Sequence, residues 1–129
     1  MKGLVQVRLK QNRLDTYYLR KKQVKKDSEG VQVDFYLPAL PFYAVMWQAS
    51  GKLQTEMYGN RLSYIRNIRI DGEYTIEVNG KHVNYVFQDG LSLCEGDGVN
   101  LYVSKDSEPD YRIILIKPYK PLYMEVEKL

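Results

Sequence analysis

Apolar and polar residues alternate with a period of two along most of this chain, which is the pattern of half-buried β-strands. The alternation recurs in six segments, at residues 5–9, 31–37, 74–78, 83–87, 99–103 and 122–126. In the last of these, Leu122, Met124 and Val126 are expected to point inward, and Glu125 and Glu127 outward. The pattern predicts strands with one face on a core and one in solvent.

Turn signals separate these segments. Asn79-Gly80 lies between two alternating segments and predicts a hairpin, because both residues tolerate positive φ. The "DSEG" stretch at 27–30 predicts a second turn, and "GDGVNLYV" predicts a turn followed by a strand that continues to Val103. "YRIILI" (111–116) is apolar on both faces and predicts a central strand covered on both sides.

Turns recur roughly every 8–12 residues, the spacing of all-β barrels and sandwiches. We therefore predict one all-β domain over residues 1–129, a small antiparallel β-barrel or sandwich with an extended loop and little helix. The stretch 50–60 has room for one short helical turn.

The segment "QASGKLQTEMYGNRLSYIRNIRI" (48–70) interrupts the strand pattern. Its first half is polar with no clean period, and its second half places Leu62, Tyr64, Ile68 and Ile70 on one side of an extended chain. Connections in small domains are usually short. We expect residues 48–61 to form a long mobile loop.

Charge is sorted along the chain, although the net charge is only +3. Residues 1–26 hold nine lysines and arginines against Asp15, a net +8, whereas residues 71–110 hold nine acids against two lysines, a net −7. One reading is that these are solvated edges. The other is that unlike faces support head-to-tail contact between copies. The candidate acidic subunit interface consists of Glu95, Asp97, Asp106, Glu108 and Asp110.

The densest basic run is "RKKQVKK" (20–26), within a predicted N-terminal hairpin arm at about 14–37. Lysines along an edge strand prevent unwanted strand pairing. They also attract a phosphate backbone or a neighbouring subunit. The candidate DNA or subunit contacts are Arg20, Lys21, Lys22, Lys25 and Lys26.

The residues offer no recognisable catalytic or metal-binding pattern. His82 follows a hairpin turn, and Cys94 lies beside Glu95 and near Asp97, which should raise the pKa of its thiol and weaken it as a nucleophile. The acids of "CEGDG" (94–98) lack calcium-loop spacing. We expect no enzyme activity and no cofactor. No apolar run approaches a membrane span, and charges interrupt any signal-peptide core, so a cytosolic, reducing environment is expected.

The order of four segments resembles a known family. The segments are "FYAVMWQASGK", "YGNRLSYIRNIRI", "EGDGVNLYV" and "PDYRIILIKPYKPLYMEVEKL". Over residues 42–129 they resemble the head-tail connector, or head-closure ("minor capsid"), proteins of long-tailed bacteriophages and prophages. The pieces that carry the resemblance are Tyr58-Gly59, the turn Gly96-Asp97-Gly98-Val99, and Pro109-Asp110-Tyr111.

The resemblance implies a β-barrel of the virion neck that is made in the host cytoplasm. Copies would be monomeric alone and would form a ring, twelve-fold in relatives, below the portal and its adaptor. The ring would retain packaged double-stranded DNA and dock the tail through its terminator. The long loop would face the channel or neighbouring rings through Ser50, Lys52, Gln54, Glu56, Tyr58 and Arg61.

Two other functions fit the residues. The basic arm suits a small nucleic-acid-binding barrel, although the acidic segment 71–110 and the lack of aromatics interleaved with the basic run oppose it. Another ring-forming virion part, such as a tail terminator, fits equally well.

Overall fold

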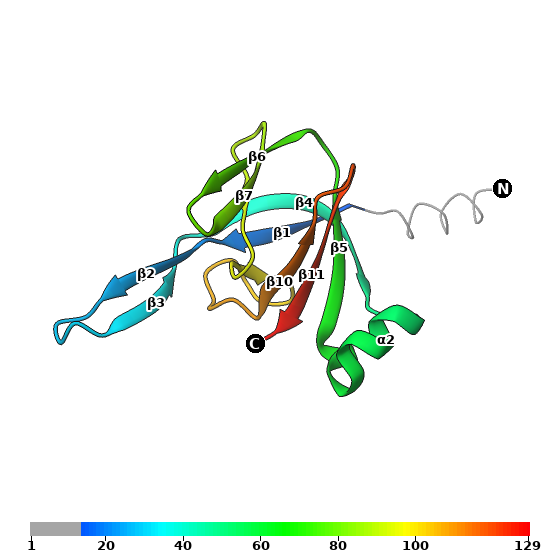
Figure 1. Ribbon diagram of the computed structural model, residues 1–129, viewed down its shortest axis with the longest axis horizontal. Coiled ribbons are helices and arrows are strands. Elements are labelled where there is room, and N and C mark those ends of the chain that lie inside the picture. The colour runs from blue at the N-terminus through cyan, green and yellow to red at the C-terminus, as the bar shows by residue number, and fades with distance from the viewer. Residues whose placement is uncertain (1–13) are drawn as a thin grey trace.

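The computed structural model describes residues 14–129, and strands make up most of it (Figure 1). Six strands close into a barrel in the order β1-β4-β5-β11-β10-β9, and every neighbouring pair is antiparallel. The prediction of a small antiparallel β-barrel is therefore confirmed. The barrel strands are β1 (Asp15–Arg20), β4 (Leu40–Gln48), β5 (Ile65–Ile70), β9 (Gly98–Asn100), β10 (Tyr111–Lys117) and β11 (Leu122–Lys128).

Three groups of elements lie outside the barrel. They are the hairpin of β2 (Lys22–Lys26) and β3 (Gln32–Tyr36); the sheet of β6 (Tyr74–Asn79), β7 (His82–Phe87) and β8 (Ser92–Leu93); and the helix α2 (Lys52–Tyr58) with the 3₁₀ helix η1 (Gly59–Tyr64). Along the longest axis of the molecule, β2 and β3 extend from one end, while α2 lies toward the other (Figure 1).

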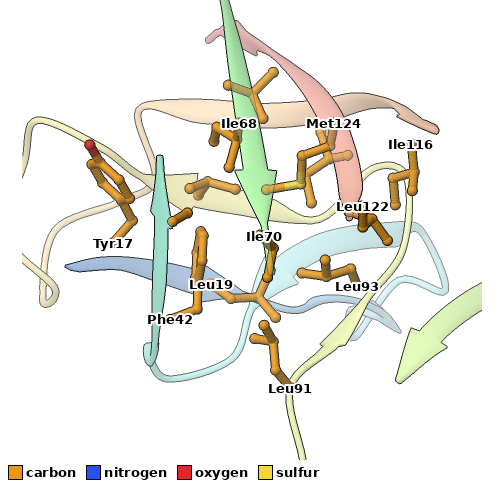
Figure 2. Close-up of a cluster of buried hydrophobic side chains, with 14 of the residues drawn as sticks. Tyr17, Leu19, Phe42, Ile68, Ile70, Leu91, Leu93, Ile116, Leu122 and Met124 are labelled. Carbon is orange, nitrogen blue, oxygen red and sulfur yellow. The ribbon is translucent and has the colours of Figure 1, made fainter. Parts of the chain in front are cut away.

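The barrel interior is filled by the inward residues of the alternating strands, as expected for a six-stranded barrel (Figure 2). Leu19, Phe42, Ile68 and Met124 from four different strands are all buried there. Leu91, close to β8, joins the same cluster and so anchors the small sheet to the barrel.

The last strand confirms the inward positions of Leu122, Met124 and Val126. Glu125 differs from expectation: it points away from the core but is only 1% exposed. The reason is that the α2 segment covers this part of the outer face, and the Tyr58 hydroxyl donates a hydrogen bond to its carboxylate.

Residues 111–116 are apolar on both faces for a different reason from the predicted burial of both sides of a strand. The register of β10 on β11 shifts between Ile113 and Leu115, so Ile114 forms a β-bulge. The bulge lets Ile113 and Ile116 both reach the core, whereas Ile114 and Leu115 are only half-buried. The outer face of β10 is thus only partly covered.

The strand predicted to reach Val103 ends at Asn100. The Asp110 carboxylate accepts hydrogen bonds from the backbone amides of Leu101 (2.9 Å) and Tyr102 (3.0 Å), which takes them out of strand pairing. The Asn100 side chain donates to the carbonyl of Ser104 at 2.7 Å. These side chains hold residues 101–110 in a loop instead.

The β6–β7 hairpin is confirmed, but its two-residue turn lies one position later than predicted. Asn79 pairs with His82, so the turn consists of Gly80 and Lys81. Only Gly80 takes a positive φ, of 65°. Val78, expected to face a core, is 71% exposed because the hairpin extends past the barrel.

The segment between β4 and β5 agrees with its prediction in one part and differs in another. The short helix for which residues 50–60 had room is α2, whereas β5 begins only at Ile65. Leu62 and Tyr64 therefore lie in η1 rather than in a strand. The predicted mobility of residues 48–61 stays a prediction.

The N-terminal arm is shorter than expected from residues 14–37. Residues 15–20 form β1, which pairs with β4 and β9 inside the barrel. Only β2, β3 and the turn between them (residues 22–36, called the arm from here on) project. The predicted strand at Val5, Val7 and Leu9 lies outside the described residues.

Candidate interaction surfaces

The α2 segment (residues 50–64) is attached to the barrel by polar side chains. Gln54 accepts a hydrogen bond from the Ser50 amide (3.1 Å) and donates one to the Asn67 side chain (2.7 Å). Arg61 donates two hydrogen bonds to Glu127, at 2.6 and 2.7 Å. Three of the predicted loop residues, Gln54, Tyr58 and Arg61, therefore hold the segment in place.

Glu125 is the most buried member of this polar attachment. It accepts a hydrogen bond from Tyr58, and Lys117 Nζ forms an ion pair with its Oε2 at 2.7 Å. Burial, and then the hydrogen bond to Glu125, raise the pKa of the Tyr58 hydroxyl, so that it stays a proton donor at any ordinary pH. The carboxylate thus connects α2 to the end of β10.

Glu127 forms the second attachment point. The hydrogen bonds from Arg61 lower the pKa of the Glu127 carboxyl, and Arg112 at 3.8 Å adds a weaker attraction. Arg61 is itself more than half exposed, so solvent screens this pair.

A cleft of about 130 Å³ separates part of the helix from the barrel. Its lining includes Gln54 on the helix side and Trp47, Tyr123 and Lys117 on the barrel side. Trp47 and Tyr123 meet edge to face with ring centroids 6.2 Å apart. The helix is therefore not sealed onto the barrel by apolar packing at this point.

The remaining side chains of α2 face solvent. Lys52 and Glu56, both predicted loop contacts, are exposed. So are two apolar residues one helical turn apart, Leu53 (69% exposed) and Met57 (51%). No residue of α2 is buried. Neither residue was among the predicted loop contacts, although their i, i+4 spacing is that of a helical face.

The base of the arm is fixed by two of the predicted basic contacts. Arg20 donates to the carbonyls of Leu37 and Ser107. Lys21 forms an ion pair of 2.7 Å with Asp97, which is 4% exposed. These two cations therefore have structural partners within the chain.

The lysines farther along the arm are exposed. Lys22 lies 3.2 Å from Asp34, and Lys25 lies over the Phe35 ring at 5.0 Å from its centroid. Lys26 is next to the turn. DNA or subunit contact by the arm stays a prediction for these three.

Three of the five predicted acidic interface residues serve the fold. Asp97 also accepts hydrogen bonds from the amides of Lys22 and Cys94, both at 3.0 Å. Glu95 accepts from the Ile116 amide at 2.9 Å, and Asp110 holds the turn at 101–102. Asp106 and Glu108 are exposed.

Basic and acidic residues that were predicted to lie on separate outer faces partly contact one another within the chain. Several of the sorted charges make contacts within the chain, as Lys21 does with Asp97, and so do not lie on opposed outer faces. The alternation of apolar and polar residues correctly placed Glu125 on the outer side of β11. Such alternation does not show whether another segment covers that side.

Candidate chemistry is sparse among residues 14–129. Within this range there is no group of three or more histidine, cysteine or acidic residues placed to hold a metal ion. Burial, followed by the Asp97 carboxylate, raises the pKa of the Cys94 thiol, in the expected direction. The same range contains no helix long and apolar enough to cross a membrane.

No protein-family model, curated protein or solved structure matches this chain. Any inference about function therefore depends on four structural features: the filled barrel, the arm, the three-stranded sheet and the helix that polar contacts hold on the barrel.

Proposed function

We propose that this protein is a structural subunit of the neck of a long-tailed bacteriophage, which forms a ring at the head-tail joint. The ring would lie beneath the portal and its adaptor, retain packaged DNA, and dock the tail. The subunit would act by binding its neighbours through its outer surfaces rather than by catalysis.

The observation that carries the proposal is the contrast between a filled interior and exposed apolar projections. Core side chains occupy the inside of the barrel, so the barrel offers its outer surface for binding. The arm and α2 extend from it toward opposite ends of the molecule (Figure 1), and both present apolar side chains to solvent. Projections of this kind suit contact with other macromolecules.

The sequence pieces that resemble connector proteins lie where the projections are attached. Tyr58-Gly59 joins α2 to η1, and the Tyr58 hydroxyl binds Glu125. Asp97 anchors the base of the arm. Pro109 packs against Gly98, where an added Cβ would lie 2.8 Å from the proline ring. The resemblance thus involves residues that position the surfaces an assembly subunit needs.

A deletion in the phage or prophage tests the proposal. Electron microscopy of the lysate should show separate tails beside tailless, emptied heads, and the intact gene supplied in trans should restore virions. Intact virions without the gene would overturn the neck assignment.

The nucleic-acid alternative has its own observation, the exposed lysines of the arm. A filter-binding assay at low and moderate salt separates the two functions. For a neck subunit we expect only weak binding to duplex DNA that disappears at moderate salt, because few phosphates would be contacted. Binding that persists would favour the alternative.

A further inference from the structure

We propose that residues 5–9 of one copy add a strand to the edge of β6 that faces away from β7 in the next copy. Residues 1–13 lie outside the described part of the structure, and it is their sequence that predicts the strand at Val5, Val7 and Leu9. The contact would join neighbouring copies, so this inference deepens the proposed function and rests on it for the ring. A contact between two different surfaces closes into a ring, or grows as a filament, according to the rotation per step.

The acceptor is the outer strand of the β6-β7-β8 sheet. Within residues 14–129, β6 pairs with β7 on one side and with no strand on the other. Only Tyr74 among its six residues is half-buried, and the other five are exposed. Natural proteins protect such an edge with lysines, a proline or a bulge. β6 has no lysine and no proline, and its register on β7 is unbroken, so its outer backbone groups are open to a further strand.

One face of this sheet is apolar and only partly covered. Ile76 pairs with Tyr85, and Tyr85 pairs in turn with the fully buried Leu93, so these side chains share a face that reaches the core. Farther along the hairpin the same face is uncovered, with Ile76 53% and Val78 71% exposed. A strand beside β6 with apolar side chains on one side would lie next to both residues and extend this face. The alternation at residues 5–9 supplies such a strand.

The other face of β6 is acidic. Glu77 is exposed there and forms no ion pair with another residue of the described range 14–129. Glu73, directly before the strand, lies 3.8 Å from Lys120, but both side chains are about three-quarters exposed and solvent screens the pair. A basic strand at this edge would therefore find carboxylates that are not already neutralised by close partners.

The charge of the donor segment complements this face. Residues 1–13 hold four lysines and arginines and no acid, a net charge of +4. In an extended chain Arg8 and Lys10 lie on the side opposite to Val5, Val7 and Leu9. When the apolar sides of the two strands coincide, the cations therefore lie on the face of Glu77. A shift of one residue would destroy both matches at once, so the pairing is specified by side chains as well as by the backbone.

The other uncovered strand edges fit the segment less well. The outer edge of β2 carries three lysines, which repel a basic segment and protect the edge from pairing. β3 carries one acid, Asp34, which lies 3.2 Å from Lys22. β8 has only two residues. Pairing with the outer edge of β3 is therefore the competing outcome of the test.

The position of β1 favours a strand supplied by another copy. The β6-β7-β8 sheet meets the far end of β1, where Lys21 Nζ lies 3.5 Å from the Asn84 side chain of β7. β1 has six residues and so spans about 17 Å. Its start lies on the side of the barrel away from β6 (Figure 1). To reach β6 of the same copy, residues 10–13 would have to run back over this length and past β7.

Chemical cross-linking between copies tests the inference on the full chain. In a Cys94→Ser background, a copy with Gln6→Cys and a mass tag is mixed at high concentration with an untagged copy that carries Thr75→Cys or Asn79→Cys. These three positions lie on the polar side of their strands, and their substitution keeps every charge. A short bismaleimide then joins cysteines that are close together and tolerates a register shift of two residues.

The control for this mixture is Gln32→Cys, an exposed polar residue in the edge strand β3. We expect a heterodimer yield for Thr75→Cys or Asn79→Cys on the order of tenfold above that for Gln32→Cys, because docking raises the local thiol concentration. Equal yields, no product, or a preference for Gln32→Cys would each overturn the inference. Docking of the segment within its own copy would also give no excess heterodimer, and so would overturn it.

Charge variants give an independent readout. Adding Glu77→Lys to the acceptor copy should lower the cross-linking yield, and adding Arg8→Glu to the donor copy should restore it in part. The control Glu29→Lys makes the same change of charge at an exposed position in the turn of the arm and should leave the yield unchanged. Circular dichroism on each variant checks that the fold is retained. Equal effects of Glu77→Lys and Glu29→Lys would contradict docking on β6.

This inference and the proposed function can fail separately. Cross-linking without any neck defect in the deleted phage would leave the contact and remove the neck assignment. A neck defect without cross-linking would leave the neck assignment and remove the contact.

Discussion

The barrel and the α2 segment are joined in one small chain, yet they are stabilised by different forces. The barrel buries apolar side chains from six strands, among them Leu19, Phe42 and Met124. The α2 segment buries none of its helical residues and depends on hydrogen bonds and ion pairs to Glu125 and Glu127. Burial of apolar area is a large contribution to stability, whereas an exposed ion pair such as that of Arg61 with Glu127 contributes little. From this comparison we expect the α2 segment to open more readily than the barrel.

Truncation in the core should have the largest effect. Phe42→Ala removes a ring that is 2% exposed and packs against Tyr17 with ring centroids 6.1 Å apart. We expect a loss of about 3–5 kcal/mol in the free energy of unfolding, measured by urea denaturation. The next residue supplies the control: Tyr43→Ala removes an aromatic ring from an exposed position on the same strand and should change stability little. Similar losses for both would contradict the assignment of the core.

The next effect concerns the junction between arm and barrel. A Cβ at Gly98 would lie 2.8 Å from the Pro109 ring and 3.0 Å from the Tyr36 ring. Because the proline ring cannot move aside, Gly98→Ala should cost about 1–3 kcal/mol by overpacking. Thermal unfolding measures this loss of stability. Ser92→Ala, at a half-buried position in β8, is the control. Gly90→Ala is unsuitable because Gly90 has a positive φ of 92°.

Glu125→Ala should separate the two regions most directly. It leaves the Tyr58 hydroxyl and Lys117 without their carboxylate, at a cost of about 1–3 kcal/mol. The Tyr58 contact belongs to α2, whereas Lys117 lies at the end of β10. We therefore expect amide hydrogen exchange to speed up most at residues 52–58, while the barrel strands away from Lys117 keep their protection.

The same exchange experiment on the unmodified protein tests the predicted mobility of residues 48–61. Amides such as that of Thr55, which donates to the Gly51 carbonyl at 3.0 Å, should exchange well before those of β4 and β5. Protection of α2 equal to that of the barrel would contradict both the predicted mobility and the comparison between the two regions.

The sequence predicts the barrel well and the α2 surface poorly, for a physical reason. Period-two alternation reports directly which side chains of a strand face the core, and it placed Leu122, Met124 and Val126 correctly. Segment 48–64 is held by contacts between residues far apart in the chain, such as Arg61 with Glu127. Sequence spacing does not record such contacts. Sequence spacing likewise does not record the ion pair of Lys21 with Asp97, two residues that were predicted to lie on outer faces.

Acid should weaken the α2 attachment, with a smaller effect on stability than any of the three substitutions above. The pKa of Glu127 is lowered in the folded protein because Arg61 hydrogen-bonds to its carboxylate. A lowered folded pKa means that the stabilisation is fully present above the ordinary value of 4.5 and is lost as the pH falls through the folded pKa. The amide resonances of residues 59–64 should therefore shift in nuclear magnetic resonance spectra below that value, while those of β1 and β4 stay in place. Arg61→Gln should move the Glu127 titration back toward its ordinary range, and added salt should do so in part, because the pair is exposed. An unchanged titration in Arg61→Gln would show that Arg61 does not set the Glu127 pKa. The attachment of the α2 segment would then depend on its other polar contacts, among them Tyr58 with Glu125 and Gln54 with Asn67.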